Sequence, residues 1–71
     1  MNEKSFDFTI YIIHALANKK NLLPKDIYAK LKKYKCIDDF LVPNYDILHT
    51  LSTNTVIDDV ENYLANRGGA L

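Results

Sequence analysis

Apolar residues recur every three or four positions along most of the chain, and they never alternate cleanly with polar residues for more than a few positions. A period near 3.6 residues is typical of amphipathic helices, whereas a half-buried strand shows a period of two. The pattern is clearest near the C-terminal end, where five apolar residues share one helical face: Val56, Ile57, Val60, Tyr63 and Leu64. The sequence therefore predicts an all-α fold, a compact bundle of about four short helices.

The length of the chain and the position of Pro43 set the expected domain and helix boundaries. The chain has 71 residues, 48% of them hydrophobic, which suits a single helical domain over residues 1–71. An interior proline removes a backbone hydrogen bond, so we expect a break near Pro43 and two short helical pieces around it. The expected helices cover about residues 5–20, 24–34, 37–48 with that break, and 55–67.

Polar residues at the expected helix ends predict how the helices are capped. Asn2 and Ser5 are both suited to cap the first helix. Thr55 followed by Asp58 is close to a capping box at the start of the last one. Residues 69–71 follow the last helix and are expected to form a frayed tail.

Charge is unevenly distributed although the formal net charge is zero. Residues 1–35 carry eight lysines and three acidic residues, a balance of +5, and residues 36–71 carry one arginine and six acidic residues, a balance of −5. Either the two halves fold against each other and offset their fields, or one half offers a charged surface to a partner. General nucleic-acid binding is typical of a net basic domain, so this composition argues against it.

Cysteine content and hydropathy favour a cytoplasmic protein with no membrane contact. Cys36 is the only cysteine, so no internal disulfide is expected and a reducing compartment is the simpler assumption. The longest apolar run, Ile10–Ile13, has four residues, far short of the roughly 20 that span a bilayer. Residues 1–4 lack the hydrophobic segment of a signal peptide.

The residues needed for catalysis or metal binding are scarce. His14 and His49 are the only histidines, and neither a CxxC nor an HExxH spacing occurs. No glycine-rich loop precedes a helix, so a phosphate-binding loop is not expected. We therefore expect no enzyme activity, no cofactor and no metal.

The first expected helix is apolar over more of its surface than one core contact requires. One face carries Phe6, Ile10, Ile13 and Ala17, and a second carries Phe8, Ile12, Ala15 and Leu16. Either this helix is central to the bundle, or its second face is covered by another chain, for example in a homo-oligomer. Phe8 and Ile12 are candidate partner-binding residues on the second interpretation.

The segment Tyr45–Ser52 combines an apolar run with polar side chains. Its aliphatic residues are expected in the core: Ile47, Leu48 and Leu51. His49 follows Asp46 by three residues, within hydrogen-bonding reach on a helical turn. Either Asp46, His49 and Thr50 close this turn and position the last helix, or the turn is exposed and forms the centre of a partner-binding surface that includes Tyr45.

Three groups of residues resemble a known family: Ile27-Tyr28 through Lys32-Lys33-Tyr34, then Tyr45-Asp46-Ile47-Leu48-His49-Thr50, then Val56-Ile57-Asp58-Asp59-Val60 with Tyr63 and Arg67-Gly68. Over Ile10–Gly68 the chain resembles a family of short bacterial proteins known only as a domain of unknown function. Its members tend to be encoded beside toxins with an ADP-ribosyltransferase-like fold, which implies an antitoxin role. Two positions depart from the family pattern: Cys36 stands where members often have glycine, and Pro43 interrupts a helix that usually has no proline.

Two functions remain open at this stage. The first is a non-catalytic protein-binding module, an antitoxin-like protein that binds and occludes an ADP-ribosyltransferase-like toxin encoded nearby. The alternative is a small helix-turn-helix DNA-binding regulator acting as a homodimer, with the basic second helix docking on DNA. Zero net charge argues against it, as does the lack of Arg, Asn or Gln on that helix to contact base edges. The candidate partner-binding residues are Tyr45, Asp46, His49, Thr50, Phe8 and Ile12.

Overall fold

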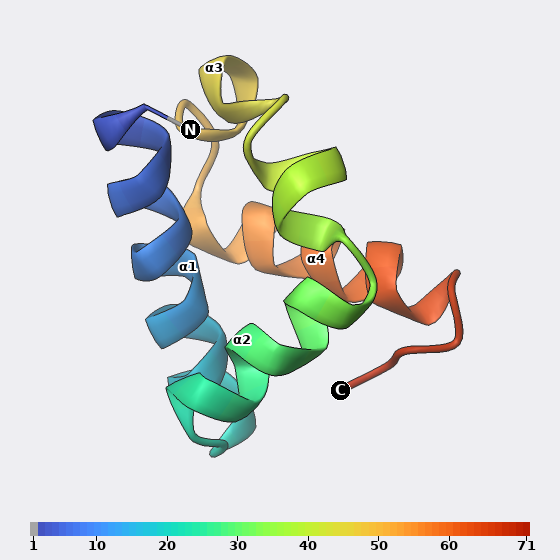
Figure 1. Ribbon diagram of the computed structural model, residues 1–71. Coiled ribbons are helices and arrows are strands. Elements are labelled where there is room, and N and C mark those ends of the chain that lie inside the picture. Colours follow the sequence, from blue (N-terminus) through green and yellow to red (C-terminus); the bar gives the residue numbers. More distant parts are fainter. Residues whose placement is uncertain (1) are drawn as a thin grey trace.

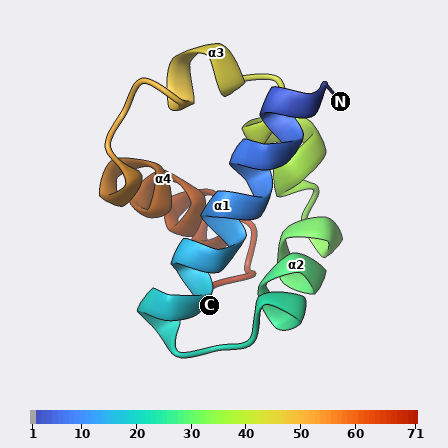
Figure 2. The same ribbon diagram turned by 90° about the vertical axis from the view of Figure 1, so that its left-hand side faces the viewer.

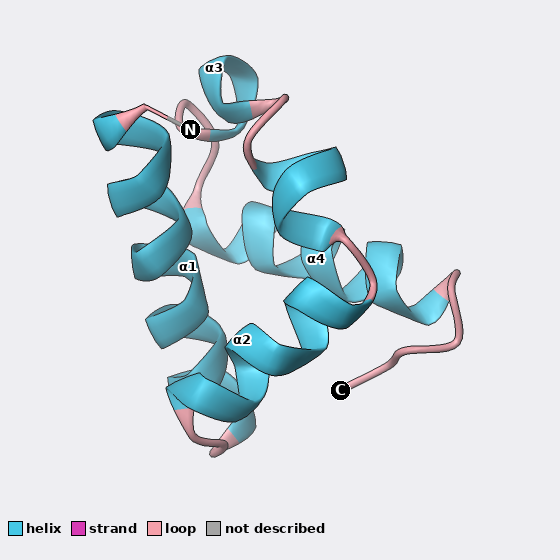
Figure 3. Ribbon diagram, viewed as in Figure 1, coloured by secondary structure: helices cyan, strands magenta, loops and turns pink. Residues whose placement is uncertain are grey.

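The computed structural model describes residues 2–71 as helices joined by turns, with no strand among them (Figures 1 and 3). The elements are α1 (Glu3–Lys20), α2 (Pro24–Lys33), a π-helix η1 (Ile37–Leu41), α3 (Tyr45–Leu48) and α4 (Thr53–Ala65). The prediction of an all-α bundle is confirmed. No helix within residues 2–71 is both long enough and apolar enough to cross a membrane.

Helix α1 is the central helix, because it packs against α2, η1 and α4 (Figure 2). It begins at Glu3 because Asn2 caps it: the Asn2 side-chain oxygen accepts a hydrogen bond from the Ser5 amide at 2.8 Å. It ends at Asn21, whose left-handed backbone (φ 56°) suits asparagine. On the second apolar face Ile12 and Leu16 are fully buried, and Phe8 and Ala15 are partly buried, so other elements of this chain cover most of that face.

One core collects the buried apolar side chains of every element. Its members are Ile12, Ile13, Leu16, Ala17, Ile27, Leu31, Cys36, Ile37, Leu41, Leu48, Val56, Ile57, Val60 and Leu64. Burial raises the pKa of the Cys36 thiol to about 12, with the charge of Arg67 opposing the shift. Cys36 therefore stays protonated near neutral pH and acts as a small apolar side chain.

The connection from α2 to α3 is irregular. Lys35 adopts a left-handed conformation (φ 60°) after α2. In η1 the amide of Val42 bonds the carbonyl of Ile37 at 3.0 Å, five residues back, which defines a π-helical turn. Pro43 follows, and the Asn44 side-chain nitrogen then donates to the Phe40 carbonyl at 2.9 Å. These bonds hold Phe40 in place ahead of α3.

Helix α4 begins two residues earlier than expected because Ser52 caps it. The Ser52 hydroxyl oxygen accepts a hydrogen bond from the Thr55 amide at 3.2 Å. The predicted capping box of Thr55 and Asp58 is therefore wrong, since both residues already lie inside the helix. The apolar face inferred from the sequence does point into the core, with Val56, Ile57, Val60 and Leu64 buried.

The two oppositely charged halves of the chain meet where the end of α1 crosses α4. Lys19 lies 3.0 Å from a Glu61 carboxylate oxygen and 3.5 Å from one of Asp58, and Lys20 pairs with the other Glu61 oxygen. Burial alone would raise the pKa of Glu61, but hydrogen bonds and charge from Lys20 and Lys19 outweigh it and hold the pKa below its ordinary value. The halves thus offset one another here, which is the first of the two interpretations of the charge pattern.

The residues after α4 are packed against the molecule, and the expectation of a frayed tail is wrong. Gly69 is buried, and its amide bonds the Leu64 carbonyl at 2.8 Å. The Tyr34 hydroxyl donates to the Gly68 carbonyl at 3.3 Å. A Cβ atom at Gly69 would overlap the Tyr34 ring, so only glycine allows this close approach.

Candidate protein-binding surface

Helix α3 is a single turn at the edge of the molecule (Figure 1), and two exposed aliphatic residues lie within it and shortly after it. Leu48 is buried at 4% exposure, as expected, but Ile47 is 65% exposed and Leu51 is 40% exposed. The prediction that Ile47 and Leu51 belong to the core is therefore wrong. A four-residue helix turns few side chains inward: Leu48 enters the core and Tyr45 packs against Phe8, so Ile47 is left at the surface.

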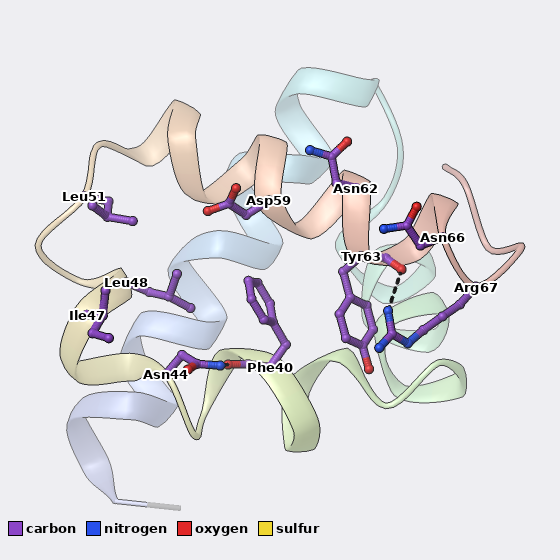
Figure 4. Close-up of a pocket in the computed structure, with 10 residues that line it drawn as sticks. All are labelled: Phe40, Asn44, Ile47, Leu48, Leu51, Asp59, Asn62, Tyr63, Asn66 and Arg67. Atoms are coloured by element: carbon purple, nitrogen blue, oxygen red, sulfur yellow. Dashed lines mark hydrogen bonds between the residues drawn. The ribbon is translucent and has the colours of Figure 1, made fainter.

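Ile47 and Leu51 border an open groove of about 500 Å³ between α3 and α4 (Figure 4). Figure 4 shows Ile47, Leu48 and Leu51 gathered at one end of the groove and Arg67 at the other. The groove is lined by ten residues: Phe40, Asn44, Ile47, Leu48, Leu51, Asp59, Asn62, Tyr63, Asn66 and Arg67. We call it the α3–α4 groove.

Helix α4 and the turn after it supply one whole side of the α3–α4 groove. The side chains on this side stand at positions i, i+3, i+4, i+7 and i+8, which places them on a single helical stripe: Asp59, Asn62, Tyr63, Asn66 and Arg67. No ion pair within residues 2–71 engages Asp59, although the neighbouring Asp58 and Glu61 are both paired. Within residues 2–71 the side chains of Asp59, Asn62 and Asn66 form no hydrogen bond or ion pair, so the stripe presents polar groups that a partner can bind.

Aromatic contacts fix the floor of the groove. The rings of Phe40 and Tyr63 stack with centroids 5.5 Å apart. The Arg67 guanidinium carbon lies 3.6 Å from the centre of the Tyr63 ring, and the guanidinium donates to the Tyr63 carbonyl at 3.2 Å. The Tyr63 hydroxyl donates to the Tyr34 carbonyl at 3.0 Å. Each ring is thus held by its neighbours, so the floor is formed before any partner arrives.

On its other side, α3 joins α1 through a row of three rings. Phe8 meets Tyr45 edge to face with centroids 5.4 Å apart, and Tyr45 stacks on His49 at 4.7 Å. The structure thus brings together three of the six predicted partner-binding residues. Ile12 is not among them, because it is fully buried in the core. The interpretation of Ile12 as a surface residue is wrong.

The polar residues of this turn mostly bond to its own backbone. The Nδ1 atom of His49 lies 2.8 Å from the Tyr45 carbonyl, to which it donates as an N–H group, and the Thr50 hydroxyl donates to the Ile47 carbonyl at 2.6 Å. Asp46 is exposed, and within residues 2–71 it forms no hydrogen bond with His49. His49 and Thr50 therefore close the turn, while Asp46 faces solvent.

A second and smaller apolar patch lies between α1, α2 and η1. Its exposed members are Phe6, Ile10 and Tyr28, around a hollow of about 110 Å³ with Lys32 and Asp38 among its lining residues. We call it the α1–α2 patch. It belongs to the first of the two apolar faces read from the sequence of α1, whereas the second face is the one that carries Ile12.

The sequence does not predict the groove. None of the ten residues that line it is among the six partner-binding residues predicted from the sequence. The one available signal was the pair of amides at Asn62 and Asn66, four residues apart beside Tyr63. Solvated helical faces are typically rich in Lys and Glu, so two aligned asparagines are a different pattern.

Among the described residues, neither a metal-ligand cluster nor an exposed thiol is found. Within residues 2–71 no group of three or more His, Cys, Asp or Glu side chains is placed to hold a metal ion. Cys36 is fully buried with a raised pKa, so its thiol is not exposed as a nucleophile. What the groove offers is an apolar floor, amides along one side and a charge toward each end.

Together these features define a compact all-α domain of short helices with an apolar surface groove. A family model described as a protein of unknown function, DUF3791, matches residues 7–67, and the chain belongs to this family. The match includes all of η1, α3 and α4, and therefore the whole α3–α4 groove. No curated protein and no solved structure matches the chain.

Proposed function

We propose that this chain is a non-catalytic protein-binding module, and that the α3–α4 groove receives its partner. The observation that carries the proposal is the exposure of Ile47 and Leu51 at the edge of a preformed aromatic floor. Contiguous exposed apolar surface on a small domain marks an interaction site, because leaving it in water gains nothing for stability.

The partner we propose is an ADP-ribosyltransferase-like toxin encoded beside this chain, which makes the chain an antitoxin. The resemblance described above supports this identity, and the shape of the molecule is compatible with it. The chain measures about 25 × 22 × 20 Å, large enough to cover a catalytic cleft. Steric occlusion of the nicotinamide-cofactor or target cleft needs no chemical group from the chain, which accords with a surface that favours binding.

Co-expression of the chain with the neighbouring toxin-like protein tests this proposal. We expect the two to co-elute from a size-exclusion column, and we expect Ile47→Asp to abolish co-elution because it places a charge against the apolar floor. Two proteins that elute separately in the wild-type experiment would contradict the proposed function.

Leu23 provides a matched control. It is 56% exposed, close to the value for Ile47, and it does not line the groove. It also occupies the N-cap position of α2, where aspartate is favoured, so Leu23→Asp is expected to fold. The Leu23→Asp chain should co-elute with the toxin like the wild type, with thermal melts confirming that both variants are folded.

A further inference from the structure

The α3–α4 groove has the length and walls that suit a helix. Its α4 side runs from Asp59 to Arg67, a rise of about 12 Å at 1.5 Å per residue. Apolar side chains at positions i, i+4 and i+7 of a partner helix span about 10.5 Å and fit within that length. An extended peptide gains affinity by adding to the edge of a sheet, and residues 2–71 contain no strand to offer one.

The charges along the groove set a direction for the occupant. Asp59 lies toward the Ile47 and Leu51 end, and Arg67 lies at the other end (Figure 4). Helices ordinarily carry acidic residues in the first turn and basic residues in the last turn, because these complement the helix dipole. Such a helix matches Arg67 with its acidic start and Asp59 with its basic end only if it runs antiparallel to α4.

A second copy of this chain fits the groove less well. The groove is concave, so two grooves placed face to face would leave space between them. The exposed α1–α2 patch of another copy would make a head-to-tail contact, which adds molecules without closing around a two-fold axis.

We propose that the α3–α4 groove binds one amphipathic helix of a partner protein, antiparallel to α4, with apolar residues at i, i+4 and i+7, an acidic first turn toward Arg67 and a basic last turn toward Asp59. This deepens the proposed function and rests on it, since it names the element that a protein-binding groove recognises. The tyrosine and phenylalanine of the floor contact the apolar residues, and the amides of Asn62 and Asn66 bond to polar residues flanking them.

Selection from a phage-displayed library of 15-residue helices, randomised on one face and at both ends, tests this on the full chain alone. We expect enriched peptides to carry apolar residues at i, i+4 and i+7, acids at the start and bases at the end. As synthetic peptides they should bind at least tenfold more weakly to Ile47→Asp, whereas Phe6→Asp, an equally apolar exposed site in the α1–α2 patch, should bind them like wild type.

The double variant Asp59→Lys with Arg67→Glu tests the direction of binding. The wild type should bind peptides with reversed terminal charges more weakly than the selected peptides. The double variant should show the opposite preference, by about the same factor in affinity. Thermal melts of each variant show whether it is folded, and Asp59→Lys alone serves if the loss of the Arg67 contact with Tyr63 unfolds the double variant.

Four results would overturn the inference: no enriched helix, enriched helices that bind Ile47→Asp unchanged, no preference between the two charge directions, or a chain that sediments as a dimer until Ile47→Asp is introduced. The proposed function fails separately, when the toxin does not co-elute although the groove binds helices. A toxin that co-elutes equally with wild type and with folded Ile47→Asp supports protein binding but contradicts the groove as its site.

Discussion

Helices α3 and α4 differ in how many of their apolar residues are buried. Over 13 residues, α4 turns Val56, Ile57, Val60 and Leu64 into the core, whereas α3 has four residues and buries Leu48 alone. A long helix lies against several neighbours, so its apolar face is covered along its length. A single turn directs only a few side chains inward, here Leu48 and the half-buried Tyr45, so Ile47 remains at the surface. Apolar character thus predicts burial only when the element is long enough to have a face.

Substitutions at two adjacent residues of α3 give the strongest test of this difference in burial. Leu48→Ala should lower the free energy of unfolding by about 2–4 kcal/mol because it leaves a cavity in the core. Ile47→Ala should change it by about 0.5 kcal/mol or less because the side chain is mostly in water. Urea titrations of both variants measure the difference, and equal losses would mean that α3 packs differently.

The next largest difference in stability is expected between the hydrogen bond that caps α4 and the one that closes α3. Ser52→Ala removes the side-chain cap of α4 and should cost about 1 kcal/mol in the free energy of unfolding. Thr50→Ala removes a single exposed hydrogen bond that closes α3, and should cost about 0.5 kcal/mol or less. Chemical denaturation compares them; Ser52→Asp, which keeps an acceptor, should restore most of the loss. A larger loss of unfolding free energy in Thr50→Ala than in Ser52→Ala would mean that the closure of α3 stabilises the fold more than the cap of α4.

The smallest effect concerns the ion pairs that α4 makes with α1 and that α3 lacks. The pKa of Glu61 is lowered in the folded chain, so its stabilising contribution is present above its ordinary value near 4.5 and is lost as pH falls through the folded pKa. Thermal melts from pH 7 to pH 3 should show this loss, and Glu61→Gln should flatten that part of the profile. An unchanged profile in Glu61→Gln would assign the acid loss to other groups.

Much of the fold follows from the sequence because its helices are long enough for periodicity to identify their buried faces. The central position of α1 and the buried face of α4 are of this kind. The groove is not, because it depends on where short elements lie. The position of Phe40 depends on the five-residue hydrogen bond of η1, and the exposure of Ile47 depends on how α3 meets its neighbours. Neither the position of Phe40 nor the exposure of Ile47 produces a periodic pattern in the sequence.

The docked residues after α4 show the same limit. Their position depends on the Tyr34 ring meeting a glycine 35 positions later, and Tyr34 is also tied to Tyr63 below the groove. A pair of glycines after a helix predicts where the helix ends, but not which residue the following segment contacts. The sequence places Asp46 and His49 on one turn, but the bond from His49 to the Tyr45 carbonyl, and not to Asp46, depends on the backbone geometry.

The π-helix η1 also has a consequence for how this family can change over time. The i→i+5 hydrogen bond of η1 encloses one residue more than an α-helical turn, so deleting one residue would return the segment to α-helical spacing and change the direction of Phe40 relative to α3. The shape of the groove therefore depends on the number of residues between α2 and α3 as well as on their identity. Within this segment, a single-residue insertion or deletion is a larger evolutionary step than most substitutions.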